Sequence, residues 1–296
     1  MVKPAYSVVE HLAKSIWLSR WRDGYFAVFS AYFDASGAET DKQVKYVAVS
    51  GFIAHTDIWI EWEKNWLDCL ERYGILNEKG LPEFHMAECA NYTYSFKGWD
   101  KREQDRQSLL RELIEIIKVL GRKASCVINI ELFKKHIDAD LREDFFFSGA
   151  YVLGGRACAA RVREWCKQCN SPIFSQVQLF FEQGDGKVLQ TDLRDRFLGD
   201  EFPEPFFRHK RNKYSKSGEL IEERLIPFQA ADVLAYLTNI NAKFSERGHW
   251  GDKEKIRWMY EDLSQMAEQT VVFSEADMKG LNELMRVSRN NPLNPA

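Results

Sequence analysis

The amino-acid sequence predicts an α/β fold in which a mixed β-sheet is layered by helices. The chain has 296 residues, 45% of them hydrophobic and 29% charged, which is ordinary for a globular protein and excludes wholesale disorder. Apolar runs of strand length alternate with longer segments whose apolar residues recur every three or four positions. The first two runs are separated by a polar segment typical of a hairpin, so antiparallel and parallel strands are both expected.

Two parts of the chain are distinguished. Residues 1–24 carry Val8, Leu12 and Ile16 on one face of an amphipathic helix, which predicts an N-terminal helical extension before the first strand. Residues 25–296 contain no linker or low-complexity stretch, so they predict a single α/β domain that ends in C-terminal helices.

The first strand is predicted at residues 26–33, where an apolar and aromatic run ends in the turn residues Asp34-Ala-Ser-Gly37. Residues 45–53 are its hairpin partner, and Thr56 is expected to cap the helix that follows. This helix carries three tryptophans at helical spacing, Trp59, Trp62 and Trp66. Such a stripe is typical of a core, and an interaction surface is the alternative.

The alternation continues through the middle and the end of the chain. Residues 81–88 are predicted as a short strand or extended segment, and Gly121 ends a helix over about 101–120. The later elements are a strand at 124–131, a helix at about 146–168, a strand at 176–182, a short helix, a basic loop at about 208–217, an apolar helix at about 228–244 and a polar closing helix at about 252–268.

Charge and composition exclude several classes of function. With 41 Lys and Arg against 44 Asp and Glu, the net charge of −3 excludes a globally basic nucleic-acid binder. Binding of nucleic acid through a local basic patch is still compatible with this charge. No uncharged apolar run is long enough to span a membrane, and the N-terminus lacks an apolar signal core, so a cytoplasmic protein is expected. Cys166 and Cys169 form the only close cysteine pair, without the further ligands that a structural zinc site needs.

Two aspartates, Asp34 and Asp232, stand at positions typical of a ligand- or metal-binding site. Asp34 ends a strand expected in the middle of the sheet, where ligands of α/β proteins bind, although a turn aspartate bonding its own backbone is equally compatible. Asp232 lies in a helix that is apolar on nearly every side, so its burial is costly unless it is paired or bound to metal. Gln229 shares its face, and capping of the first helical turn is the alternative role for Asp232.

Further acidic groups and one histidine compete for roles beside them. Glu182 and Glu131 each end a predicted strand, so topology alone leaves both as candidates, whereas Asp185 is expected in a turn. His85 and Glu88 share a face if their segment is helical, and a purely structural histidine is the alternative.

Four short motifs share their order and spacing with a known family. They are Asp34-Ala-Ser-Gly37, Phe84-His-Met-Ala-Glu88, the strand-terminal Glu182, and Phe228-Gln-Ala-Ala-Asp232. Over about residues 26–245 they resemble the bacterial and phage family catalogued as domain of unknown function 3800, which is grouped with the ribonuclease-H-like superfamily. That family usually opens with Asp-Glu-Ser-Gly, so Ala35 removes one candidate ligand here, and Glu182 stands where aspartate is more common.

The resemblance implies a ribonuclease-H-like fold and a carboxylate cluster that binds Mg²⁺ or Mn²⁺ for phosphodiester hydrolysis. Asp34, Glu182 and Asp232 would hold the metal, Glu88 would be an auxiliary ligand, His85 would assist proton transfer and Gln229 would orient Asp232. Hard oxygen ligands suit these ions. Acidic groups without matching bases would repel one another at neutral pH, and a metal removes that repulsion.

A nuclease must also hold the phosphate backbone. The basic loop supplies Arg208, Lys210, Arg211, Lys213 and Lys216, with Tyr214 available to stack on a base. A solvated loop without a binding role is the alternative. The leading hypothesis is a metal-dependent nuclease or phosphodiesterase, and the second is a non-catalytic nucleic-acid- or protein-binding module. The sequence is compatible with DNA or RNA as the substrate, and with a homo-oligomer or a complex with a partner protein.

Overall fold

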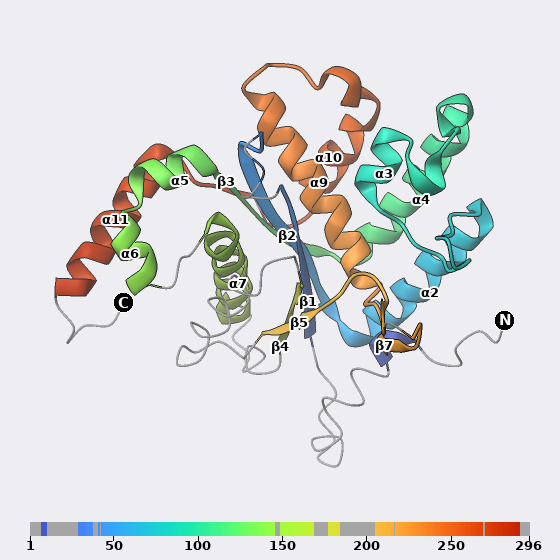
Figure 1. Ribbon diagram of the computed structural model, residues 1–296, viewed down its shortest axis with the longest axis horizontal. Coiled ribbons are helices and arrows are strands. Elements are labelled where there is room, and N and C mark those ends of the chain that lie inside the picture. Colours follow the sequence, from blue (N-terminus) through green and yellow to red (C-terminus); the bar gives the residue numbers. More distant parts are fainter. Residues whose placement is uncertain are drawn as a thin grey trace, which may run out of the picture.

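A central mixed sheet organises the molecule (Figure 1). The computed structural model describes residues 7–10, 29–37, 41, 43–145, 149–168, 177–183, 205–215, 217–268 and 270–290. Most of the predicted N-terminal helix, the predicted short helix, Asp185, Cys169 and Lys216 lie outside these residues. Among the described residues, six strands form one sheet in the order β5-β4-β1-β2-β3-β8, which bears out the prediction of a mixed α/β fold.

The sheet combines an antiparallel meander with parallel strands. β1 pairs antiparallel with β2, and β2 with β3, whereas β4 and β5 continue in parallel beyond β1, and β8 lies parallel to β3. The bounds are β1 Phe29–Ser36, β2 Tyr46–His55, β3 Arg122–Asn129, β4 Val177–Glu182, β5 Phe206–Arg208 and β8 Val271–Val272. In register, Tyr32 lies between Phe52 of β2 and Phe180 of β4.

Helices occupy the connections between the strands. The β2–β3 connection contains α2 Thr56–Tyr73, α3 Met86–Asn91, the 3-10 turns Tyr94–Phe96 and Trp99–Arg102, and α4 Glu103–Lys118. After β3 come α5 Ile130–His136, α6 Ala139–Asp144 and α7 Ala150–Gln168. The small hairpin β6 Lys213–Tyr214 and β7 Leu220–Glu222 precedes α9 Pro227–Ser245, the 3-10 turn Gly251–Ile256, α10 Arg257–Ser264 and α11 Glu275–Asn290.

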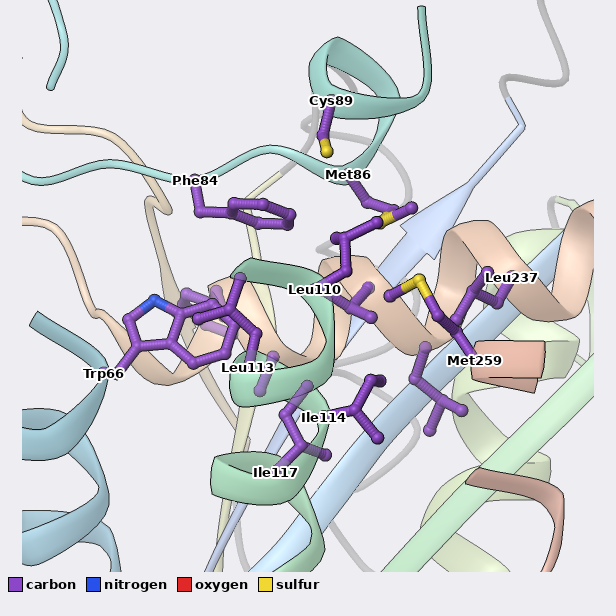
Figure 2. Close-up of a cluster of buried hydrophobic side chains, with 14 of the residues drawn as sticks. Trp66, Phe84, Met86, Cys89, Leu110, Leu113, Ile114, Ile117, Leu237 and Met259 are labelled. Atoms are coloured by element: carbon purple, nitrogen blue, oxygen red, sulfur yellow. The ribbon is translucent and has the colours of Figure 1, made fainter. Parts of the chain in front are cut away.

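One face of the sheet is covered by α2, α4, α9 and α10, on the right in Figure 1. Trp59, Trp62 and Trp66 of α2 are fully buried there, so the interpretation of this stripe as an interaction surface is wrong. Figure 2 shows Trp66 and Phe84 beside the apolar side chains that α4 contributes to this core. Burial of these large aromatic side chains removes much apolar surface from water and stabilises this layer.

The opposite face is covered by α7, with α5, α6 and α11 beyond it (Figure 1). Alternate strand residues divide between the two cores: Phe33 and Phe181 stack on the α7 side, whereas Tyr32 and Phe180 stack on the α9 side. Gly154 of α7 lies so close to Val49 of β2 that an added Cβ would be only 2.7 Å from its side chain. Because side chains along a strand alternate between the two faces of the sheet, this alternation also decides which strand carboxylates lie on the α9 side.

Several predicted details are corrected by tertiary contacts. His55, not Thr56, caps α2, because its Nδ1 accepts a hydrogen bond from the Asp57 N–H at 3.3 Å. Strand β3 ends at Asn129, whose side chain caps α5, so Glu131 lies in a helical first turn rather than at a strand end. The predicted basic loop contains strand β6, and β8 and α11 follow the helix that was expected to close the chain.

Candidate functional site

A layer of aromatic rings positions three carboxylates on the α9 side of the sheet. Tyr32 stacks on Phe180 with centroids 4.7 Å apart and meets Phe228 of α9 edge-on at 5.8 Å. Asp34 follows Tyr32 by two residues, Glu182 follows Phe180 by two, and Asp232 lies one helical turn after Phe228. The carboxylates therefore extend from neighbouring parallel strands and from the helix across them, at the carboxyl ends of β1 and β4.

Asp34 is 2% exposed and accepts two hydrogen bonds. Its Oδ1 accepts from the Ala35 N–H at 2.7 Å, as a turn aspartate would, and its Oδ2 accepts from Lys210 Nζ at 2.9 Å. Burial raises the pKa of Asp34, the charge of Lys210 opposes this, and the charge of Asp232 adds to it.

Asp232 is held by three groups from outside its own helix. Its Oδ2 accepts from the Met86 N–H at 2.8 Å and so caps α3, and its Oδ1 lies 3.3 Å from Lys210 Nζ and 3.9 Å from His85 Nδ1. Burial opposes ionisation, but Lys210 and His85 hold the pKa of Asp232 well below its usual range. The alternative role, capping the first turn of its own helix, is wrong.

Lys210 supplies the base that the sequence-based argument lacked. Its ammonium lies between Asp34 and Asp232, and the charges of these residues and of Glu182 outweigh burial and raise the pKa of Lys210. The prediction that the acidic groups have no matching base is therefore wrong, because a residue predicted to bind phosphate pairs with two of them. No local signal distinguishes Lys210 from its basic neighbours.

Glu182 is the third carboxylate of the cluster, and its environment favours the protonated form. Burial and the charge of Asp34 raise the pKa of Glu182 to about 7, although Lys210 lowers it. Glu131 lies in α5 after β3, the second strand from β1, and its N–H donates to the side chain of the cap residue Asn129. Of the two candidates that topology left open, the structure brings Glu182 to Asp34.

His85 links Asp232 to a second group of charged side chains, formed by Arg211, Glu83 and Glu88. Arg211 Nε donates to His85 Nε2 at 2.9 Å, and its Nη2 donates to Glu88 at 2.9 Å. Burial lowers the pKa of His85, but the hydrogen bonds of Asp232 and Glu83 outweigh it and raise the pKa to about 9. Since Nε2 accepts from Arg211, protonation of this nitrogen requires the guanidinium to move away.

Glu83 was missed by sequence reasoning although it is central to this set. It binds Arg224 at 3.0 Å, accepts from Asn77 at 2.8 Å and lies 3.5 Å from His85. Burial opposes ionisation, but hydrogen bonds from His85 and Asn77 lower the pKa of Glu83 to about 2. Its position directly before Phe84-His85 was the one available signal.

Gln229 binds the backbone of the segment before α3, not the side chain of Asp232. Its Oε1 accepts from the Trp66 indole at 2.9 Å and from the Phe84 N–H at 3.0 Å. It thereby fixes the extended segment that carries His85, so the predicted orientation of Asp232 by Gln229 is corrected. Among the other basic residues, Arg208 is paired in register with Glu182, and Lys213 is exposed on β6.

Carboxylate oxygens are the ligand type that a hard divalent cation prefers. In the part of the chain that the structure describes, however, no group of three or more His, Cys, Asp or Glu side chains is close enough to hold a metal ion, and the Lys210 ammonium lies between Asp34 and Asp232. The positive groups beside these carboxylates are the Lys210 ammonium and the His85 imidazole, whose raised pKa favours its charged form. Carboxylate oxygens have lone pairs left for a metal.

Comparisons with protein-family models, with curated proteins and with solved structures found no match to this chain. Among the described helices, none has both the length and the apolar character needed to cross a membrane.

Proposed function

We propose that this protein is a divalent-metal-dependent phosphodiesterase that cleaves nucleic acid. The observation that carries the proposal is the gathering of Asp34, Glu182 and Asp232 around Lys210, at the carboxyl ends of neighbouring strands and on the helix across them. Two independent features support it. The meander extended by parallel strands is compatible with a ribonuclease-H-like sheet, and the four sequence motifs resemble the family described above.

The three carboxylates would hold Mg²⁺ or Mn²⁺, which supplies activation of water and neutralisation of charge at the phosphate. Lys210 lies between Asp34 and Asp232, and Arg211 contacts His85 and Glu88; both bind the phosphodiester when they release their present partners. His85, between Asp232 and Glu83, accepts or donates a proton at Nε2 once Arg211 has moved. Glu88 holds Arg211 in place rather than a metal.

One observation favours the alternative of a non-catalytic binding module. The Lys210 ammonium occupies the position between Asp34 and Asp232, which gives a charge-paired site without metal. Ala35, which replaces a carboxylate in the opening motif, is consistent with this alternative. The two functions differ in whether a divalent ion displaces Lys210.

Cleavage assays on matched glutamine variants test the proposal. Purified protein is incubated with labelled single- and double-stranded DNA and RNA, with Mn²⁺ or with chelator. We expect metal-dependent cleavage that Glu182→Gln reduces at least tenfold, because a ligand is lost. The control Glu131→Gln, at the rejected candidate position, retains full activity. Cleavage that survives in chelator, or equal loss in both variants, contradicts the proposal.

The raised pKa of Glu182 makes a prediction for stability without metal. Between about pH 4.5 and pH 7 the folded protein keeps a proton that unfolded Glu182 has released. The free energy of unfolding therefore falls as the pH rises through about 7, by at most about 3 kcal/mol, and Asp34 acts in the same direction. Urea unfolding from pH 5 to pH 8 in chelator measures this slope. Glu182→Gln should make the slope less steep, and the part that remains above about pH 6.5 belongs to His85, whose raised pKa acts in the same direction. An unchanged slope contradicts the assignment.

A further inference from the structure

A cavity of about 600 Å³ opens beside the carboxylate cluster. His85 connects the two: Arg211 and Glu83, which line the cavity, contact His85, and His85 lies 3.9 Å from Asp232 of the cluster. The volume is that of a small-molecule site. A group bound in the cavity is thus connected to Asp232 through a lining residue, Arg211 or Glu83, and His85.

Tyr94 lines this cavity in an unusual backbone conformation. Its side chain is 74% exposed, and its φ of +48° lies in the left-handed region that tyrosine rarely adopts. The flanking residues fix it: Ser95 Oγ donates to the Leu76 carbonyl at 2.8 Å, and Phe96 is fully buried against Phe84. Strain of this kind persists where the surrounding structure imposes it and is concentrated at ligand sites. The fold thus presents an exposed aromatic ring on a rigid support.

A second aromatic ring and several polar groups complete the lining. Lys79 Nζ lies over the ring of Tyr214, and the Tyr214 hydroxyl accepts from Asn212 Nδ2 at 3.2 Å. The carboxylates of Glu83 and Glu88 are already paired with Arg224 and Arg211. The cavity thus combines two aromatic rings with amides, cations and the carboxylates of Glu78, Glu83 and Glu88, which suits a flat, polar, aromatic ligand better than an apolar one.

We propose that this cavity binds an unpaired base of single-stranded nucleic acid, next to the phosphate held at the carboxylate cluster. The inference rests on the proposed function and names its substrate class. Stacking on Tyr94 requires a free face of the base, which a base inside a duplex does not offer. Arg211 lies between the two sites and is placed to contact the connecting phosphate.

Binding of a fluorescein-labelled single-stranded oligonucleotide, measured by anisotropy in chelator at low salt, tests the inference without cleavage. We expect Tyr94→Ala to weaken binding roughly tenfold, whereas Tyr94→Trp, which keeps a stacking face, binds like the wild type. Thermal unfolding should show little change for either variant, because the side chain is exposed. A duplex of the same sequence should bind more weakly and respond little to Tyr94→Ala.

The outcomes separate this inference from the proposed function. If the wild type cleaves single strands with Mn²⁺ but Tyr94→Ala binds and cleaves them unchanged, the base subsite is wrong and the phosphodiesterase stands. If single strands bind through Tyr94 but no metal-dependent cleavage occurs, the subsite stands and the proposed activity fails. Preference of the wild type for duplex overturns the inference.

Discussion

Lys210→Met is expected to lower the free energy of unfolding in chelator by about 3 kcal/mol, because it leaves buried carboxylates without their counter-charge. Methionine keeps the unbranched shape and most of the length of the side chain and removes the ammonium. Protonation of Glu182 and Asp34 relieves part of the repulsion, so the loss should be smaller at pH 5 than at pH 8. Urea unfolding at both pH values measures the effect.

The same variant distinguishes a catalytic from a non-catalytic site. If Mn²⁺ competes with the ammonium for Asp34 and Asp232, the increase in melting temperature on adding Mn²⁺ should be larger in Lys210→Met than in the wild type. The control Lys213→Met removes an exposed lysine of the same segment and should change stability by less than about 0.5 kcal/mol. Absence of any Mn²⁺ effect in both proteins would support the binding module.

Asp232→Asn is expected to abolish metal-dependent cleavage while the protein stays folded. The amide oxygen can still accept from the Met86 N–H, but the charge that a metal and Lys210 require is lost. In chelator we expect the free energy of unfolding to fall by about 2 kcal/mol, because Lys210 keeps Asp34 as a partner and loses only Asp232. Cleavage assays and melting curves on the same preparations measure both effects.

A matched aspartate elsewhere controls for loss of negative charge. Asp68 is exposed on α2, so Asp68→Asn should keep both activity and stability. Wild-type cleavage by Asp232→Asn would remove this residue from the reaction. A higher melting temperature than the wild type in chelator would mean that repulsion from the other carboxylates outweighs the pairing with Lys210 and His85.

Much of the fold follows from local sequence patterns. The apolar strands and the helix at Asp232 are predicted within a few residues of their observed bounds, because periodicity of two and of three to four is a local property. Predicted helix caps were less accurate. His55 replaces Thr56 as the cap of α2, and Asn129 starts α5 where a strand was expected to continue, because the ends of elements depend on contacts outside them.

The sequence by itself determined that Asp34 and Asp232 stand at unusual positions, because a charged residue at a strand end or in an apolar helix is visible in the local pattern. Only the tertiary structure decided which charges meet there. Lys210 pairs with Asp34 across 176 residues of sequence, and Glu83 meets Arg224 across 141. Electrostatic pairing depends on distance in space, and no periodicity in the chain encodes which distant side chains the folded sheet brings together.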